Sequence, residues 1–160
     1  ARAAVADLDL KNVYPKLDSK RTLGEVLLQP TRIYVEPIIK LLRQYTVKKV
    51  VSGMAHITGG GIGGNVCRCL CDGVDATIDL NAWEVPAIFN LLQDRGDIET
   101  SEMFHVFNMG IGYVLIVRPA FADSIAAHLK YEGEEPVVLG TITKGSGEVH
   151  LVGGDSATCS

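Results

Sequence analysis

The sequence predicts an α+β fold in which helices pack against a mixed, largely antiparallel sheet. Strand-like runs and segments of helical periodicity interleave along the chain, which is the pattern of a sheet covered by helices. The turn Lys144-Gly145-Ser146-Gly147 joins the last two strand-like runs and predicts an antiparallel hairpin. The 160 residues, 47% of them hydrophobic, suffice for one domain with its own core, predicted at 1–152, and 153–160 has the composition of a tail.

The first two helices are predicted from their start and stop signals. Thr22-Leu23-Gly24-Glu25 is a capping box, so a short helix begins there and ends before Pro30, since proline disfavours a helical residue in front of it. Residues 33–35 are predicted to be extended. Pro37 is predicted to be the first residue of the second helix, because proline fits that position and apolar residues then recur at helical spacing.

The remaining elements follow from the same patterns. The helix at 81–96 is predicted to open with a second capping box, Asn81 with Glu84, and to close at Gly96. The other predicted helices cover 62–70, 101–107 and 121–131, and the predicted strands cover 47–52, 76–80, 113–117, 137–143 and 148–152.

Composition and charge argue against several classes of protein. The net charge of −4 disfavours binding to nucleic acid, and no apolar run reaches the ~20 residues of a membrane span. Cys67, Cys69 and Cys71 lack a second pair of ligands at zinc spacing, and with Cys159 they make a poor disulfide framework. We therefore expect no metal site, cysteines that pack as small hydrophobic residues, and a cytoplasmic protein.

The segment 54–61 is the most informative part of the sequence. A β-rich run ends in His56, Thr58 and the glycines Gly59, Gly60 and Gly61, and a predicted helix follows. Glycines let a ligand approach the backbone, and a helix start offers unpaired N–H groups to phosphate, to which His56 and Thr58 would add donors. The alternative is a tight strand-to-helix turn that contains a buried histidine. No Lys-Ser/Thr pair of a P-loop follows the glycines, so no triphosphate cradle is expected within this chain.

Two further segments carry candidate binding residues. In 107–112 glycines alternate before an apolar strand, and Asn108 either binds a ligand or fixes a neighbouring segment. Arg32 lies beside an apolar run and either pairs with a carboxylate or contacts phosphate through its guanidinium group.

Taken in order, these segments resemble the phosphoribosylformylglycinamidine cyclo-ligases, also called AIR synthetases, over residues 17–147. The run His-Ile-Thr-Gly-Gly-Gly at 56–61 selects this family among its relatives. The matching pieces are Thr22-Leu23-Gly24-Glu25, 28–35, 53–61, Asn65, Arg68, Trp83, Phe89, 92–93, Gly96, 102–103, Phe107-Asn108, Gly110 and Gly112.

The resemblance implies the C-terminal domain of a two-domain enzyme, with a partial ferredoxin-like topology. Such enzymes use ATP and Mg²⁺ to convert formylglycinamidine ribonucleotide into aminoimidazole ribonucleotide in purine biosynthesis. The resemblance also implies a homodimer and an N-terminal domain, absent from this chain, that holds most of the ATP and Mg²⁺ site. By position, His56 is then the catalytic residue, and substrate or phosphate is bound by Thr58, Gly59, Gly60, Gly61, Asn108 and Arg32.

The chain begins at Ala1, and we expect it to be the second half of such an enzyme, inactive on its own. Some positions depart from the family's pattern. Where the family usually has Glu-Asn-Ile-Pro-Arg, this chain has Gly64-Asn65-Val66-Cys67-Arg68. The glutamate of the family's pattern is missing, so no role can be assigned to its carboxylate here. Met109 stands where Cys is common, and Tyr113 where Met is common. Two other functions stay open: a non-catalytic binding or regulatory module, and another ATP-dependent enzyme similar to selenophosphate synthetase or thiamine-phosphate kinase.

Overall fold

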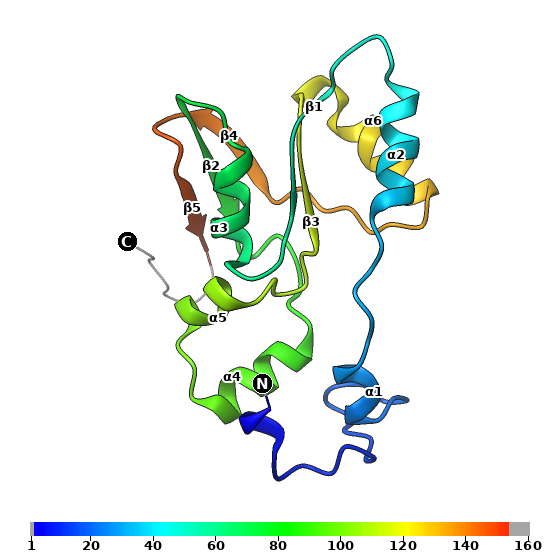
Figure 1. Ribbon diagram of the computed structural model, residues 1–160, viewed down its shortest axis with the longest axis vertical. Helices are drawn as coiled ribbons and strands as arrows, with labels where there is room; N and C mark the ends of the chain where they lie inside the picture. Colours follow the sequence, from blue (N-terminus) through cyan, green and yellow to red (C-terminus); the bar gives the residue numbers. More distant parts are fainter. Residues whose placement is uncertain (1, 154–160) are drawn as a thin grey trace.

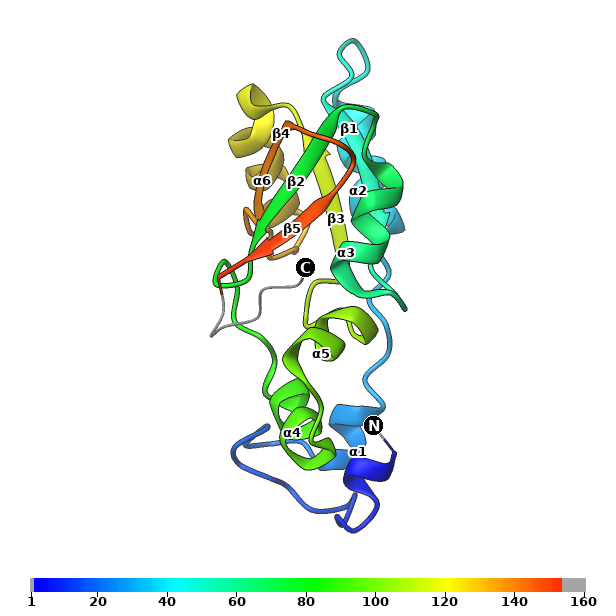
Figure 2. The ribbon, with the colours of Figure 1, turned by 90° about the vertical axis from the view of Figure 1, so that its left-hand side faces the viewer.

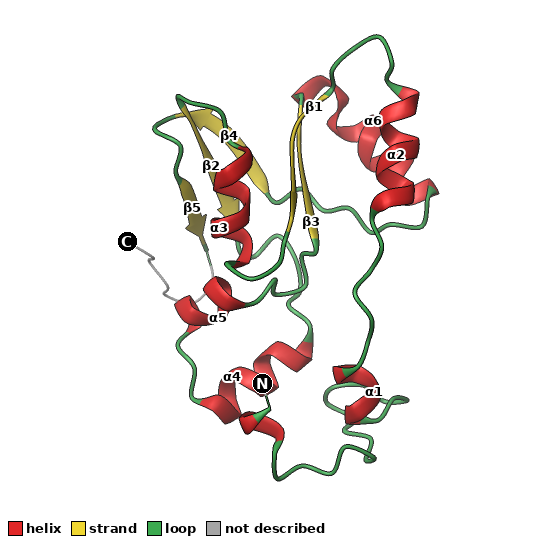
Figure 3. Ribbon diagram, viewed as in Figure 1, coloured by secondary structure: helices red, strands yellow, loops and turns green. Residues whose placement is uncertain are grey.

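The structure is a computed structural model that describes residues 2–153, and its elements are shown in Figure 1 and, by type, in Figure 3. The α-helices are α1 (Leu23–Leu27), α2 (Val35–Gln44), α3 (Gly61–Val66), α4 (Ala87–Gly96), α5 (Thr100–Val106) and α6 (Ala122–Tyr131). The strands are β1 (Val51–His56), β2 (Val74–Asp79), β3 (Tyr113–Val117), β4 (Gly140–Lys144) and β5 (Val149–Val152). Short 3₁₀ turns are η1 (Ala3–Val5), η2 (Cys67–Cys69) and η3 (Pro119–Phe121). The predicted tail, apart from Gly153, and Cys159 lie outside the described residues.

The strands form two small sheets, so the predicted α+β class with largely antiparallel pairing is confirmed. β1 pairs antiparallel with β3, from Val51 opposite Val117 to His56 opposite Tyr113. In the second sheet β2 lies in the centre, antiparallel to β4 on one edge and parallel to β5 on the other. The predicted hairpin between the last two strands is therefore wrong: the turn between β4 and β5 crosses the end of β2, and the two strands lie on opposite edges of it.

Asp75 explains why the last turn crosses β2. Its Oδ1 accepts hydrogen bonds from the backbone N–H groups of Ser146 (2.7 Å), Gly147 (2.9 Å) and Glu148 (2.9 Å). Its Oδ2 lies 3.2 Å from Nε2 of His150. A single carboxylate on β2 thus fixes a turn more than seventy residues later in the chain, and no local pattern in the turn itself encodes this contact.

We expect Asp75→Asn to weaken the second sheet and to change its acid sensitivity. Hydrogen bonds, led by that from the backbone N–H of Glu148, lower the pKa of Asp75 to about 2. Because this pKa lies below the ordinary value of 3.8, the stabilisation is fully present above about pH 4 and is lost as the pH falls towards 2. Thermal unfolding should show a Tm several degrees lower at neutral pH and a flatter fall between pH 4 and 2.

Asp72→Asn is the matched control, because Asp72 is exposed and lies just before the same strand. Equal acid profiles for the wild type and Asp75→Asn would contradict the assignment of the turn to Asp75.

The hydrophobic core is divided into three clusters. One lies among η1, α1, α4 and α5, and the second lies around α3 and between the two sheets. The third lies between the first sheet and the pair α2 and α6, where Leu41 is fully buried. Figure 2 shows the sheets with α2, α3 and α6 at one end of the molecule, and α1 and α4 at the other. No helix within residues 2–153 is both long and apolar enough to cross a membrane.

The local signals of the sequence predicted some element boundaries and missed others. The first capping box is confirmed, since Thr22 and Glu25 exchange side-chain to backbone hydrogen bonds at the start of α1. The second is wrong: α4 begins at Ala87, because Pro86 keeps Val85 out of the helical region. Its predicted end at Gly96 is confirmed.

Other boundaries are shifted because pairing partners, rather than local pattern, fix them. The first strand was expected at 47–52, but β1 runs from Val51 to His56 along β3, and β4 likewise begins three residues later than expected. α2 already begins at Val35, so residues 33–35 are not all extended and Pro37 is its third residue. The helix at 62–70 continues as η2 after α3, while β3, α5 and α6 lie within one residue of their predicted bounds.

Candidate functional site

The antiparallel pairing of β1 with β3 brings the two glycine-rich segments to the same end of the first sheet. His56 is the last residue of β1 and lies opposite Tyr113, the first residue of β3. Just beyond this pair, the backbone N–H of Ile57 donates to the carbonyl oxygen of Gly112 at 2.9 Å. The segment that leaves β1 therefore runs beside the segment that enters β3, close to α5 (Figure 1).

The loop from Thr58 to Gly61 needs glycine at two positions. Gly60 and Gly61 have φ angles of +97° and +61°, a region that side chains disfavour. Gly61 is also packed against the end of α5: a Cβ there would overlap the carbonyl oxygen of Phe104 and lie 2.8 Å from its carbonyl carbon. The neighbouring Thr58 and Gly59 are exposed. The loop thus combines a closely packed inner side with an accessible outer side.

The side chain of Asn65 fixes this loop through hydrogen bonds, a role that the sequence alone did not predict. Only 7% of the residue is exposed, and its Nδ2 donates to the carbonyl oxygens of Gly61 (2.7 Å) and Gly59 (3.3 Å). Its Oδ1 lies 3.5 Å from a guanidinium nitrogen of Arg68, at the edge of hydrogen-bond range. The signal in the sequence is a polar residue between the apolar Ile62 and Val66 on the buried face of α3.

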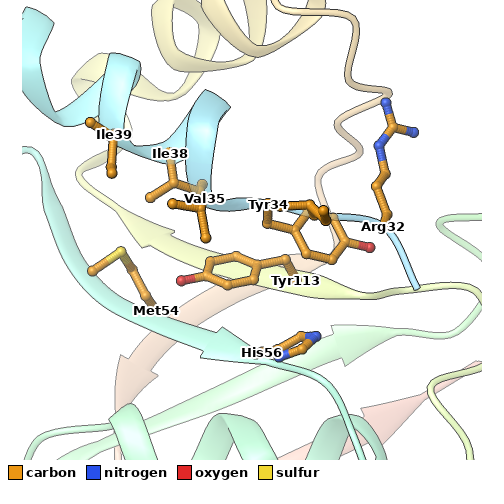
Figure 4. Close-up of a pocket in the computed structure, with 9 residues that line it drawn as sticks. Arg32, Tyr34, Val35, Ile38, Ile39, Met54, His56 and Tyr113 are labelled. Atoms are coloured by element: carbon orange, nitrogen blue, oxygen red, sulfur yellow. The ribbon is translucent and has the colours of Figure 1, made fainter. Parts of the chain in front are cut away.

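His56 opens onto a shallow pocket of about 350 Å³ between β1, β3 and the start of α2, shown in Figure 4. The imidazole ring lies edge-on to Tyr34, with centroids 5.9 Å apart, and stacks on Tyr113 at 6.1 Å. The two tyrosine rings are 5.3 Å apart. Partial burial raises the pKa of the Tyr34 phenol above its ordinary value of 10. The pocket is lined by Arg32, Ile33, Tyr34, Val35, Ile38, Ile39, Met54, His56 and Tyr113.

The structure brings together some of the predicted site residues and separates others. Arg32 lines the same pocket as His56, but its guanidinium pairs with Glu134 at 3.0 Å and donates to the carbonyl oxygen of Gly133 at 2.6 Å. Asn108 lies in the segment before β3, where its Oδ1 accepts from the N–H of Gly110 at 3.1 Å and closes a turn.

Thr58, Gly59, Gly60 and Gly61 follow His56 in the adjoining loop and do not line the pocket. The candidate site thus has two adjacent parts: the aromatic pocket that His56 faces, and the glycine loop beyond it.

The next feature is whether side chains of the described residues could hold a metal ion. Within the described part of the chain, no group of three or more His, Cys, Asp or Glu side chains is placed to hold a metal ion. Cys67 and Cys71 are exposed and Cys69 is half-buried, and burial raises the pKa of the Cys69 thiol. The described residues therefore offer no set of ligands that fits a bound Mg²⁺.

The chain is similar in sequence to several known proteins and matches one family. The chain is 46% identical over 140 residues to the phosphoribosylformylglycinamidine cyclo-ligase of Bacillus cytotoxicus. The aligned residues make up 88% of this chain and 39% of that protein. The proteins of the same name from Desulfitobacterium hafniense and Alkaliphilus metalliredigens are 48% and 44% identical, over 86% and 81% of this chain and 38% and 36% of theirs.

The chain thus spans about two fifths of the length of the curated relatives that it matches. Residues 3–153 match the family described as AIR synthase related protein, C-terminal domain. That match covers nearly all of the described residues, including both glycine-rich segments, and so the chain belongs to the AIR synthase related family through its C-terminal domain.

Proposed function

We propose that this chain is the C-terminal domain, residues 1–152, of an ATP-dependent phosphoribosylformylglycinamidine cyclo-ligase. The observation that carries the proposal is its identity of 44–48% to proteins of that name over most of its length. The geometry supports it, because His56 and the glycine loop lie together at one accessible end of the first sheet.

The proposed reaction closes the imidazole ring of aminoimidazole ribonucleotide. ATP transfers its terminal phosphoryl group to the formamide oxygen of formylglycinamidine ribonucleotide, which turns that oxygen into a leaving group. An internal nitrogen of the substrate then bonds to the same carbon, the carbon–oxygen bond breaks, and ADP and phosphate are released. Such a reaction needs positioning and charge stabilisation more than a covalent nucleophile on the protein.

The residues of this chain are proposed to hold the phosphorylated part of the substrate. His56 donates a hydrogen bond or a proton to the departing phosphate oxygen. Thr58 and the N–H groups of Gly59, Gly60 and Gly61 bind phosphate from the outer side of the loop. Asn108 and Arg32 complete the site, the latter with a side chain that is 52% exposed although it is paired with Glu134.

ATP and Mg²⁺ are assigned to a domain outside this chain. The described residues offer no cluster of ligands for the cation, and the segment that follows His56 lacks the lysine of a P-loop. When bound there, Mg²⁺ would neutralise charge on the ATP phosphates. We also infer a cytoplasmic homodimer in which this domain closes the substrate side of the cleft.

The test compares the isolated chain with the longer protein that contains it. The longer protein should form aminoimidazole ribonucleotide only with ATP, with one ADP and one phosphate released per ring closed, while the 160-residue chain should form none. The measurement is product formation coupled to ADP release. Turnover by the isolated chain, or ATP use by the longer protein on another substrate alone, would contradict the proposal.

A further inference from the structure

The imidazole of His56 is held by aromatic rings rather than by polar partners. Among residues 2–153, no hydrogen bond or ion pair involves the His56 side chain, which stands exposed at the end of β1. Its ring contacts are with Tyr113, stacked at an interplanar angle of 28°, and with Tyr34, edge-on at 64° (Figure 4). An exposed side chain at a strand end would otherwise sample several rotamers, so these contacts select the orientation of the ring.

Tyr34 is itself fixed by contacts with the backbone of β3's entry segment. Its phenol lies over Gly112, where a Cβ would come within 2.7 Å of Cζ and 3.1 Å of Cε2 of Tyr34. Only glycine at 112 therefore leaves room for the ring. The same partial burial raises the pKa of the phenol.

Arg32 anchors the backbone that carries Tyr34 to the segment after α6. Two residues before Tyr34, the Arg32 side chain bonds to the carbonyl oxygen of Gly133 and pairs with Glu134, in the segment between α6 and β4. Tyr34 is the residue just before α2, and α2 packs against α6. Three distant parts of the chain thus converge to place one ring beside His56.

We propose that Tyr34 and Tyr113 are positioning residues that hold the His56 imidazole in its working orientation, with Arg32 as the anchor of Tyr34. The inference rests on the proposed function, because it gives His56 the role of donor. In this proposal Arg32 also acts by anchoring Tyr34, and this role does not require Arg32 to contact phosphate. Loss of either ring frees the imidazole without removing it, so the expected defect is in the chemical step rather than in substrate binding.

The kinetic test uses the longer protein that contains this chain. Tyr34→Leu and Tyr113→Leu should each lower kcat about tenfold with KM within twofold of wild type, since small losses of alignment cost rate. Tyr34→Phe and Tyr113→Phe keep the rings and should retain kcat within twofold. Tyr131→Leu is the matched control, because Tyr131 is 87% exposed and lies at the end of α6, outside the pocket.

A spectroscopic test follows the ring contact independently of activity. In protein labelled at histidine, the ring protons of His56 should be displaced by the ring currents of Tyr34 and Tyr113. The displacement should be lost in the leucine variants and kept in the phenylalanine variants. Because this readout needs no turnover, it still reports on the contact if the longer protein proves to catalyse another reaction.

The proposal is overturned if the His56 signals do not move in the leucine variants, or if they move while kcat stays at the wild-type value. A phenylalanine variant as impaired as its leucine counterpart also overturns it, because that result assigns the effect to the hydroxyl group. Should Tyr34→Leu fail to fold, Tyr113→Leu carries the same test through the other ring that contacts the imidazole.

Discussion

Replacing Gly61 by alanine is expected to unfold the centre of the domain. The new Cβ would overlap the carbonyl oxygen of Phe104, which is backbone and cannot move without displacing α5 from α3. The φ angle of +61° adds a further penalty for any residue with a side chain. Together these effects should exceed about 4 kcal/mol, a large share of the stability of an ordinary domain. Thermal unfolding should show a Tm lower by roughly 10 °C or more, or no soluble protein.

Gly63→Ala is the control in the same helix. A Cβ at Gly63 meets nothing within 4 Å, and its φ angle is not in the left-handed region. Alanine there should stabilise α3 by roughly 0.4–1 kcal/mol, because it restricts the unfolded chain. If Gly61→Ala unfolds at the temperature of the wild type, the packing of the glycine loop against α5 is not as described.

Replacing His56 by alanine is expected to have the largest effect on activity. In the longer protein, kcat should fall by about 10²–10⁴-fold, the usual contribution of a positioned acid or base. His56→Asn keeps a hydrogen-bond donor but cannot transfer a proton, so an intermediate kcat would indicate that hydrogen bonding supplies part of the effect. Product formation at saturating ATP and substrate is the measurement.

His105→Ala serves as the control for the loss of a histidine. His105 is exposed at the end of α5 and does not line the pocket, so its removal should leave kcat unchanged. An activity of His56→Ala within threefold of the wild type, with Tm preserved, would remove His56 from the site.

Elements with strong local signals were predictable from the sequence. The capping box of Thr22 and Glu25 forms as expected, and the apolar run of β3 is found at its predicted residues. The sequence also placed His56 at the junction between a strand and a glycine loop. These features depend on residues within a few positions of one another, so a single sequence is enough to recognise them.

Features that depend on distant contacts were not predictable. The local pattern of the last turn predicts a hairpin, because the carboxylate that binds this turn, Asp75, lies more than seventy residues away. Asn65 was not assigned a role because its carbonyl partners are created only when the loop folds. Pairing of Arg32 with a carboxylate is one of the two alternatives that the sequence offers, but its partner Glu134 is not, since that contact depends on the segment after α6. The ring of Tyr34 beside His56 likewise depends on how the chain before α2 packs.

The central place of β2 has a consequence for the order of folding. β2 is made before both of its partners, and one of its edges is covered only by β5, about seventy residues later in the chain. During synthesis that edge exposes unpaired backbone groups until residue 152 has emerged, and such an edge is a site for pairing with other chains. Loss of β5 should therefore appear first as aggregation of the nascent protein rather than as a change in the folded protein.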